Sequence, residues 1–185
     1  VKSAVDEKFY SKPIDKIIFR KKYGFNSNSI LVGMIAQFIP RKGHKKIIYI
    51  MNDLVCEYDD IHLLLYGIGP MINEIKYLIS KLNLEKKIHI LGFVDNIEKQ
   101  IGALDMIVHP AEKEGLGVAL LQASSAKVPV VTTNVGGIPE IIKNNFNGFL
   151  VSPDDKNGMK IAMKKLIENR NLRETFGKNG NKIVK

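Results

Sequence analysis

Short apolar runs alternate with amphipathic stretches along most of this chain. Six runs consist mainly of aliphatic and β-branched residues with little polar alternation, at residues 30–36, 62–66, 88–91, 106–109, 129–132 and 148–151. Runs of this length predict strands, and the missing alternation is typical of a sheet covered on both faces. The pattern therefore predicts a buried sheet of about six strands.

The stretches between these runs have helical spacing. Apolar residues recur every three or four positions over residues 47–55 and again over residues 72–82. Two further helices are predicted over residues 118–127 and through residues 161–167. Strands that alternate with helices in this way indicate right-handed βαβ units. The predicted fold class is α/β, a Rossmann-like doubly wound parallel sheet.

The two ends of the chain depart from this pattern. A helix is predicted from Pro13 to Lys22, ended by Gly24, and the charged segment from residue 169 is expected to be helical and to pack weakly. We divide the chain into a linker and leading helix (1–28), a Rossmann-like ligand-binding domain (29–168) and a helical tail (169–185). Because the sequence does not begin with Met, we expect it to be a piece of a longer protein.

Composition narrows the class of protein. Hydrophobic residues make up 45% of the chain and charged residues 25%, which are ordinary values for a globular domain. The apolar run at residues 30–36 is far shorter than the ~20 residues that a membrane span needs. The single cysteine, Cys56, lies in an apolar helical stretch and is expected to be buried, with no disulfide. A reducing, cytoplasmic location follows.

The formal net charge of +9 raises the question of an anionic partner. The lysines are scattered, for example in the pairs at residues 45–46, 86–87 and 164–165, and no aromatic residues interleave with them. Nucleic acid is therefore not expected as a partner. A solvated basic face is the first interpretation, and an anionic membrane surface or a phosphorylated ligand is the second.

Ligands of open α/β sheets bind beyond the carboxyl ends of the strands, so the loops after the strands are the places to search. After the first strand, Lys42 stands just before a helix, where its charge adds to that of free backbone amides and suits an anion. An ordinary solvated loop lysine is the equal alternative. After the second, Gly67 and Gly69 allow a close backbone approach or simply a tight turn. No third glycine or ribose-binding acid follows at dinucleotide spacing, which disfavours NAD.

The segment from His109 to Gln122 gives the strongest signal. Glu114 precedes two glycines that open an apolar helix, so first-turn amides can hold phosphate oxygens while the carboxylate binds hydroxyl groups. Gln122 lies two turns further within reach of the same cleft. His109, which precedes Pro110, lines this cleft or packs in the core; both interpretations stay open.

Two more loops complete the set. The loop at Gly92, Phe93 and Val94 can lay backbone against a nucleobase or simply end a strand, and the loop at Gly136 and Gly137 again joins a strand to a helix. The remaining histidines, at positions 44, 62 and 89, lack carboxylate or cysteine partners at ligand spacing, so no metal site is predicted.

Taken in order, these segments resemble the C-terminal domain of family 4 (group 1) glycosyltransferases, which have the two-domain GT-B architecture. The resemblance extends from about Val5 to Val184, and the segment from Asp6 to Pro13 looks like the one that follows the interdomain linker. The seven matching segments are Lys42-Gly43, Gly67-Ile68-Gly69, Leu91-Gly92-Phe93-Val94, Glu114-Gly115-Leu116-Gly117, Pro129-Val130-Val131, Gly136-Gly137-Ile138-Pro139-Glu140 and Asn147-Gly148-Phe149-Leu150-Val151.

The resemblance implies a function and a site. Enzymes of this family move a sugar from a nucleoside-diphosphate donor to an acceptor hydroxyl, usually with retention of configuration. By resemblance, Lys42 would neutralise the diphosphate and Glu114 would bind hydroxyls of the transferred sugar. The backbone at Gly115, Leu116 and Gly117 would bind phosphate or sugar. The other donor-binding residues implied are Gln37, Arg41, Gly67, Gly69, Gly92, Phe93, Val94 and Gln122, with the base at residues 92–94 and the ribose at Gln122. No metal or other cofactor is implied.

The sequence departs from the family pattern at two positions. Gln122 stands where the family commonly has Glu, and Gln37 stands where it commonly has Arg, five residues before Lys42. An amide accepts hydrogen bonds only through its carbonyl oxygen and carries no charge, so weaker donor binding is expected unless Arg41 replaces the missing cation.

The resemblance also implies a missing partner. The N-terminal acceptor-binding domain is not part of this sequence, so the chain alone is expected to bind nucleotide weakly and to transfer no sugar. The expected setting is surface polysaccharide or glycolipid synthesis, either in the cytoplasm or at the inner face of the membrane as a peripheral protein. The alternatives are a non-catalytic nucleotide-binding module and a nucleotide-sugar epimerase of the same architecture.

Overall fold

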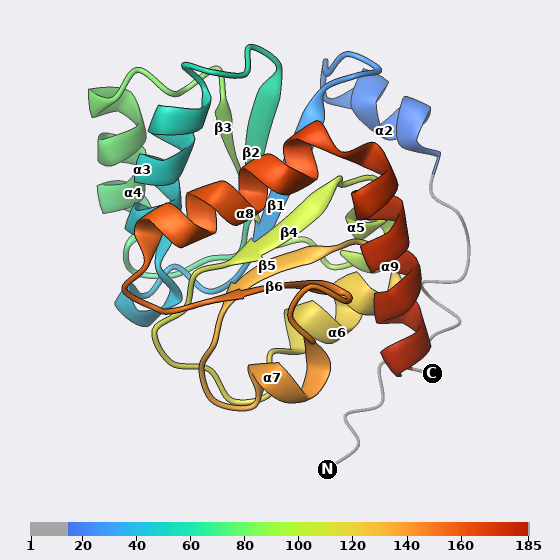
Figure 1. The fold of residues 1–185 in the computed structure, drawn as a ribbon. Coiled ribbons are helices and arrows are strands. Elements are labelled where there is room, and N and C mark those ends of the chain that lie inside the picture. The colour runs from blue at the N-terminus through green and yellow to red at the C-terminus, as the bar shows by residue number, and fades with distance from the viewer. Residues whose placement is uncertain (1–14, 185) are drawn as a thin grey trace.

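A six-stranded parallel sheet forms the centre of the computed structural model, which describes residues 15–184 of the 185-residue chain. The strands lie in the order β3-β2-β1-β4-β5-β6 (Figure 1). Their bounds are β1 Ile30–Ile35, β2 Ile61–Tyr66, β3 Ile88–Gly92, β4 Met106–His109, β5 Val130–Thr133 and β6 Gly148–Val151. All six predicted strands and the doubly wound α/β class are confirmed.

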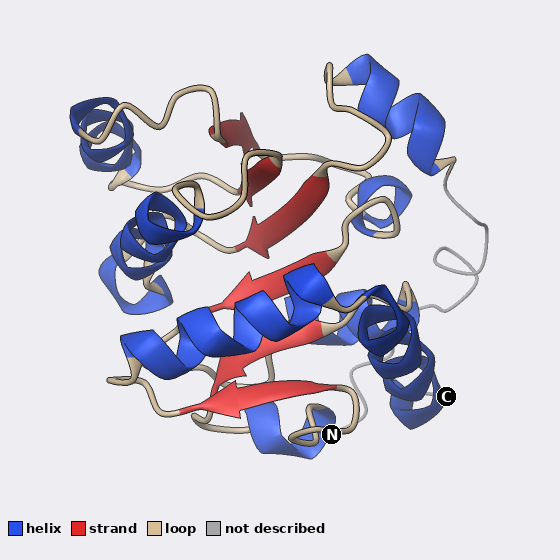
Figure 2. Ribbon diagram, turned by 45° about the horizontal axis from the view of Figure 1, so that its top comes forward, coloured by secondary structure: helices blue, strands red, loops and turns tan. Residues whose placement is uncertain are grey.

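Helices cover both faces of the sheet (Figure 2). One face carries α3 (His44–Leu54), α4 (Ile72–Lys81) and α8 (Lys156–Glu168). The other carries α2 (Lys16–Lys22), α5 (Glu98–Ile101), α6 (Val118–Ser125) and α7 (Ile138–Ile141). The short 3-10 turn η1 (Pro40–Lys42) precedes α3, and α9 (Arg170–Val184) is the last element.

The central strands are buried on both faces. In β1, Val32 and Met34 belong to the core beneath α3, α4 and α8, whereas Leu31 belongs to the core on the opposite side. Because successive side chains of a strand point to opposite faces, both sets of positions must be apolar. This explains why the strand segments read as continuous apolar runs.

The leading helix begins at a defined cap. The Asp15 carboxylate accepts hydrogen bonds from the N–H groups of Ile17 and Ile18, at 2.9 and 3.0 Å, so α2 begins at Lys16. The helix ends at Lys22, as predicted, and Gly24 follows in the left-handed conformation with φ 73°. The predicted start at Pro13 and the linker segment from Asp6 to Pro13 lie outside the described residues.

The prediction that the tail packs weakly is wrong. Phe176 of α9 is buried and its ring meets that of Phe149 edge-on at 5.2 Å. Gly180 faces Ser124 of α6 so closely that a β-carbon there would lie 3.3 Å from the Ser124 hydroxyl, and Gly177 lies against the carbonyl of Lys127. Two glycines therefore let this mostly polar helix pack against α6 and the turn after it, and Phe176 packs it against β6.

The prediction of a buried Cys56 is also wrong. Helix α3 ends at Leu54, and Cys56 is exposed in the turn that follows, with its thiol 3.4 Å from the carbonyl oxygen of Asn52. Val55 still packs against the core, whereas Cys56, one residue further, faces solvent. No disulfide partner exists in the sequence, as expected.

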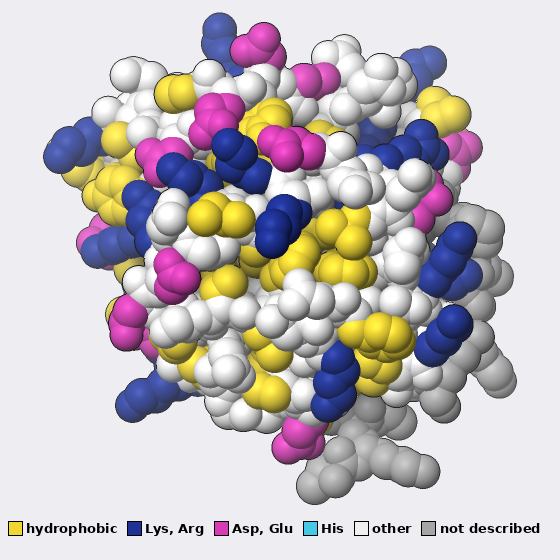
Figure 3. All heavy atoms as spheres, in the orientation of Figure 1, with side chains coloured by type: hydrophobic (Ala, Val, Ile, Leu, Met, Phe, Trp, Pro, Cys, Tyr) yellow, Lys and Arg dark blue, Asp and Glu magenta, His cyan; other side chains and the backbone are white. Residues whose placement is uncertain are grey.

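The surface charge is mixed. Figure 3 shows Lys and Arg side chains interspersed with Asp and Glu over the face that carries α8. Three of the ion pairs involve the helices of this face: Lys45–Glu74, Lys160–Asp53 and Lys164–Glu57. Within residues 15–184, no helix combines the length and apolar character that crossing a membrane requires.

Candidate functional site

The loops after β1 and β4 meet where the strand order reverses. Lys42 closes η1 after β1, and Glu114 lies in the loop between β4 and α6. The Lys42 ammonium is 2.5 Å from the Glu114 carboxylate, and each side chain is only 12% exposed. The carboxyl edge at such a reversal is the usual ligand site of doubly wound sheets. The two residues predicted as catalytic are therefore in direct contact at this point.

His109, the last residue of β4, completes the cluster. Its Nε2 lies 2.7 Å from the same carboxylate oxygen of Glu114, and its side chain is 3% exposed. The other carboxylate oxygen accepts the N–H of Gly115 at 3.1 Å. The sequence alone did not decide whether His109 lines the cleft or packs in the core. The feature that pointed to the cleft was its position at a strand end, five residues before Glu114.

These contacts keep Glu114 ionised. The hydrogen bond from His109, and after it that from Lys42, together lower the pKa of the Glu114 carboxyl to about 2, although burial acts in the opposite direction. At neutral pH the carboxylate therefore only accepts hydrogen bonds, which suits it to bind hydroxyl groups.

The β1 and β4 loops are fastened to each other by their backbones. The N–H of Glu112 donates to the carbonyl of Arg41 at 2.8 Å. Gly43 adopts φ 78°, and its α-carbon lies so close to the carbonyl of Pro110 that no side chain fits. This close approach places the adjacent Lys42 over the β4 loop.

The β5 loop holds the Glu114 segment from the other side. The N–H of Gly137 donates to the carbonyl of Gly115 at 2.9 Å, and Gly136, with φ 53°, abuts the carbonyl of Glu114. Gly117 is the left-handed N-cap of α6, with φ 64°. The segment that carries Glu114, Leu116 and the first amides of α6 is thus fixed on both sides.

The predicted glycines after β2 allow neighbouring loops to pack closely against each other. The N–H of Gly67 donates to the carbonyl of Gly92 at 2.7 Å, which joins the β2 and β3 loops. A β-carbon on Gly67 would overlap the carbonyl of Ala36, and one on Gly69 would lie 2.5 Å from that of Phe38. The close approach that these glycines permit is therefore to the β1 loop.

The remaining predicted residues lie on the same edge but outside the Lys42–Glu114 cluster. Phe93 is 69% exposed and, with Val94, lines a separate pocket of about 550 Å³ against α2. Gln37 and Arg41 are exposed, and Gln122 is partly exposed in the second turn of α6. The structure thus brings Lys42, Glu114 and residues 115–117 together, whereas the donor-binding roles of all these residues stay predictions.

The histidines away from the cluster form a pair that the sequence did not show. His62 Nδ1 lies 3.2 Å from His89 Nε2, and His62 Nε2 lies 3.1 Å from Asp60. Among residues 15–184, no group of three or more His, Cys, Asp or Glu side chains is placed to hold a metal ion.

His44, which opens α3, makes stability sensitive to acid. Its ring is buried against Phe38, with centroids 4.3 Å apart, and neither ring nitrogen has a partner among the described residues. Burial lowers its pKa to about 4, and nearby His109 and Lys42 act in the same direction. The unfolded chain takes up this proton near pH 6.5, whereas the folded chain does so only near pH 4. Stability is therefore full above pH 6.5 and is lost as the pH falls toward 4.

The expected loss from this residue is about 3 kcal/mol, because each unit between the two pKa values corresponds to ~1.4 kcal/mol. Urea unfolding at pH 7 and at pH 4.5 measures it. In His44→Leu the decrease between the two pH values should be smaller than in the wild type, although His62 and His89, whose pKa values burial also lowers, keep part of it. An equal decrease in both proteins would contradict the assignment.

Comparison with known proteins identifies the protein family to which this fold and site belong. The model of the glycosyl transferases group 1 family matches residues 15–183. The chain therefore belongs to the group 1 glycosyltransferase family, and its fold is that of one half of a GT-B enzyme.

Relatives whose names specify an activity support this family assignment. N-acetyl-alpha-D-glucosaminyl L-malate synthase of Bacillus anthracis is 30% identical over 97% of this chain and 47% of its own length. UDP-Gal:alpha-D-GlcNAc-diphosphoundecaprenol alpha-1,3-galactosyltransferase of Escherichia coli is 28% identical over 100% of this chain and 49% of its own. The chain spans about half the length of these relatives.

Solved structures share the fold. HepE from Anabaena, crystallised with UDP and glucose, superposes with a TM-score of 0.90 at 24% identity, over 98% of this chain and 50% of its own. The separately crystallised C-terminal domain of a group 1 glycosyltransferase (LpcC) from Francisella tularensis gives a TM-score of 0.85 at 24% identity, over 98% and 96% of the two chains.

Proposed function

We propose that this chain holds a nucleoside-diphosphate sugar for a retaining glycosyltransferase, which moves the sugar to an acceptor hydroxyl in polysaccharide or glycolipid synthesis. The observation that carries the proposal is the Lys42–Glu114–His109 cluster at the reversal of strand order. Relatives of this chain carry names that specify sugar transfer, and one structural neighbour was crystallised with UDP and glucose.

In this proposal Glu114 binds the sugar of the donor and Lys42 binds its diphosphate. His109 and the N–H of Gly115 hold the Glu114 carboxylate in place, so Glu114 accepts hydrogen bonds from sugar hydroxyls without rearranging. The Lys42 ammonium exchanges its carboxylate partner for the diphosphate oxygens. As the bond to the sugar breaks, negative charge grows on the diphosphate, and a fixed cation stabilises that charge.

Backbone amides supply the rest of the charge stabilisation in this proposal. Helix α6 begins directly after Gly117, so its first N–H groups at Val118 and Ala119 are free to donate to phosphate oxygens. With Lys42 beside them, we propose that the diphosphate is neutralised without a metal ion. Donor binding should then be unchanged by a chelator.

The acceptor site belongs to the half of the enzyme that relatives possess and this sequence does not include. We propose that the chain by itself binds donor and transfers nothing, and that the complete enzyme works in the cytoplasm beside the inner membrane surface. A non-catalytic nucleotide-binding module is the second candidate. It is favoured by Gln37 and Gln122, which stand where the family pattern has charged residues.

The test is a calorimetric titration of the chain with UDP, GDP, ADP and their sugar conjugates. Lys42→Ala is expected to weaken nucleotide binding at least tenfold, or ~1.4 kcal/mol, because the diphosphate loses its buried cation. Glu114→Gln should weaken binding of the sugar conjugate more than that of the free nucleotide. Lys86→Ala, which removes an exposed lysine far from the cluster, is the matched control.

Unchanged affinity in Lys42→Ala would remove Lys42 from the site. If no nucleotide binds the chain, the titration is repeated on a protein that includes the preceding half. Binding there that depends on Lys42 supports the proposal, and its absence contradicts it. Sugar transfer by the full enzyme, measured in the same preparation, separates an active glycosyltransferase from a binding module.

A further inference from the structure

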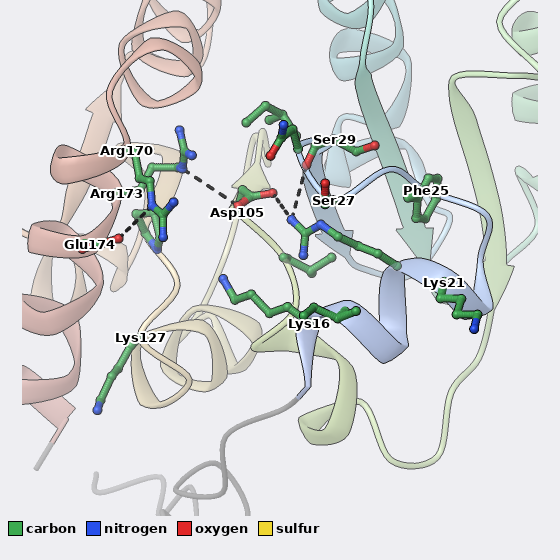
Figure 4. A pocket seen from close by; sticks show the side chains of 16 residues that line it. Lys16, Lys21, Phe25, Ser27, Ser29, Asp105, Lys127, Arg170, Arg173 and Glu174 are labelled. Atoms are coloured by element: carbon green, nitrogen blue, oxygen red, sulfur yellow. Dashed lines mark hydrogen bonds and ion pairs between the residues drawn. The ribbon is translucent and has the colours of Figure 1, made fainter.

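A second pocket opens at the opposite edge of the sheet, where the strands begin. Its volume is about 490 Å³, and Ser29, Asp105 and Pro129 line it directly before β1, β4 and β5. Helices α2 and α9 form its other walls (Figure 4). Because the strands are parallel, this pocket and the Lys42–Glu114 cluster lie at opposite ends of the sheet.

The pocket is strongly basic. Two carboxylates, Asp105 and Glu174, line it against six cationic side chains, a formal excess of four positive charges. The cations come from three separate stretches of the chain, α2, the turn after α6 and α9: Lys16, Arg20, Lys21, Lys127, Arg170 and Arg173. On the face that Figure 3 shows, by contrast, positive and negative side chains are mixed.

The two carboxylates are already occupied. Asp105 pairs with both Arg20 and Arg173, with distances of 2.9 and 4.0 Å between the charged groups. Figure 4 shows Asp105 facing Arg173. Glu174 pairs with Arg170 at 3.0 Å. Lys16, Lys21 and Lys127 have no ion-pair partner among the described residues, so the positive charge of the pocket is left uncompensated within that part of the chain.

Arg20 and Arg173 are largely shielded from water, whereas the other four cations are exposed. Arg20 is 6% exposed, and its Nε has no hydrogen-bond partner within residues 15–184. Burial lowers the pKa of the Lys16 ammonium. The neighbouring guanidinium groups of Arg20, Arg173 and Arg170 lower it further, while Asp105 opposes them. Gathering like charges around one pocket is unfavourable, and a bound anion would relieve their repulsion.

The chemistry of the walls indicates what kind of anion fits. Guanidinium groups and lysines that converge from different elements suit a doubly charged oxyanion better than a single carboxylate. Ser27 and Asn28 add hydroxyl and amide groups, and Ile17 and Phe25 add apolar surface. The volume accommodates more than one phosphate group.

We infer that this pocket is an anion site for a phosphate-bearing ligand, separate from the donor site. The phosphate belongs either to a soluble phosphorylated molecule or to the headgroup of an anionic lipid. In the second case the pocket would fix the amino edge of the sheet at a membrane surface, with the Lys42–Glu114 edge turned away from it.

The experiment follows backbone amide resonances of the ¹⁵N-labelled chain during titration with inorganic pyrophosphate. A homologous C-terminal domain was crystallised alone, so a chain of this extent forms a folded unit. We expect saturable shifts at Lys16, Ser29, Lys127 and Arg170. Lys42→Ala removes the donor-site response and should leave these shifts unchanged, which distinguishes the two sites.

The double variant Lys16→Gln/Lys127→Gln is expected to raise the dissociation constant at the pocket at least tenfold. The control Lys76→Gln/Lys86→Gln removes the same charge from exposed positions that do not line the pocket and should change it less than twofold. Shifts confined to the donor-site loops, or equal affinities in the two double variants, would overturn an inorganic-phosphate site.

A sedimentation assay with phosphatidylcholine vesicles, with and without phosphatidic acid, identifies the source of the phosphate. Co-sedimentation that needs phosphatidic acid and is lost in Lys16→Gln/Lys127→Gln, but not in the control, assigns the pocket to a lipid headgroup. Pyrophosphate shifts without co-sedimentation assign it to a soluble ligand. Failure of both assays at low salt overturns the inference, whatever the outcome of the nucleotide titration.

Discussion

Asp105→Asn is expected to lower the free energy of unfolding by about 3–5 kcal/mol, the usual cost of removing one partner from a buried ion pair. The Asp105 carboxylate accepts a hydrogen bond from Arg20 at 2.9 Å and one from the N–H of Leu31, also at 2.9 Å. It thereby ties α2 and the start of β1 to the start of β4. Without its charge, the buried guanidinium of Arg20 loses its only ion-pair partner among the described residues.

Urea unfolding at neutral pH and low salt measures this loss. Asp95→Asn, in the exposed loop after β3, is the matched control and should stay within about 0.5 kcal/mol of the wild type. A loss below 1 kcal/mol in Asp105→Asn would show that Arg20 and Arg173 find water or other acceptors, and that the ion pair does not join α2 to the sheet.

Gly136→Ala is expected to destabilise the domain by about 2–4 kcal/mol, through backbone strain and overlap. Gly136 has φ 53°, a conformation unfavourable for alanine, and a β-carbon would overlap the carbonyl oxygen of Glu114. The strain can be relieved only by moving the loop that holds Glu114, so nucleotide affinity should fall as well.

Gly115→Ala provides the comparison within the same loop. A β-carbon at Gly115 meets nothing within 4 Å, so its unfolding free energy should change by no more than about 0.5 kcal/mol. Thermal unfolding of both variants without nucleotide makes the test independent of any contact with a ligand. Equal stability of the two variants would mean that the β4 and β5 loops separate easily.

The sheet was predictable because its central strands are buried on both faces. Residues 30–36 and 62–66 are therefore mainly apolar, without the alternation of a half-exposed strand. Helix α5, with four residues, is too short to show a helical period and was missed, whereas the start of α7 was predicted from the glycines that precede it. The tail was misjudged for a different reason. Its contact with α6 depends on Gly177 and Gly180, which allow a close approach because they have no side chain. Such positions add nothing to an apolar pattern in the sequence.

The candidate site was predictable in part. Lys42 and Glu114 each follow a strand and precede a helix, and this local context favoured both residues. Their contact depends on β1 lying beside β4, which the resemblance to a known architecture implied and local pattern could not. The basic pocket is built from segments as distant as Lys16 and Arg173, each unremarkable alone, so only the folded chain shows it.

The pairing of β1 with β4 also shapes how the chain must assemble. Within each half of the sheet, neighbouring strands are consecutive in sequence: β1, β2 and β3 on one side, β4, β5 and β6 on the other. The seam between them aligns Val32 with Met106, which closes a loop of some seventy residues and costs more chain entropy than any other strand pairing. Pairings of high sequence separation slow folding. Each half can therefore form early, while the seam, which also brings Lys42 to Glu114, closes late.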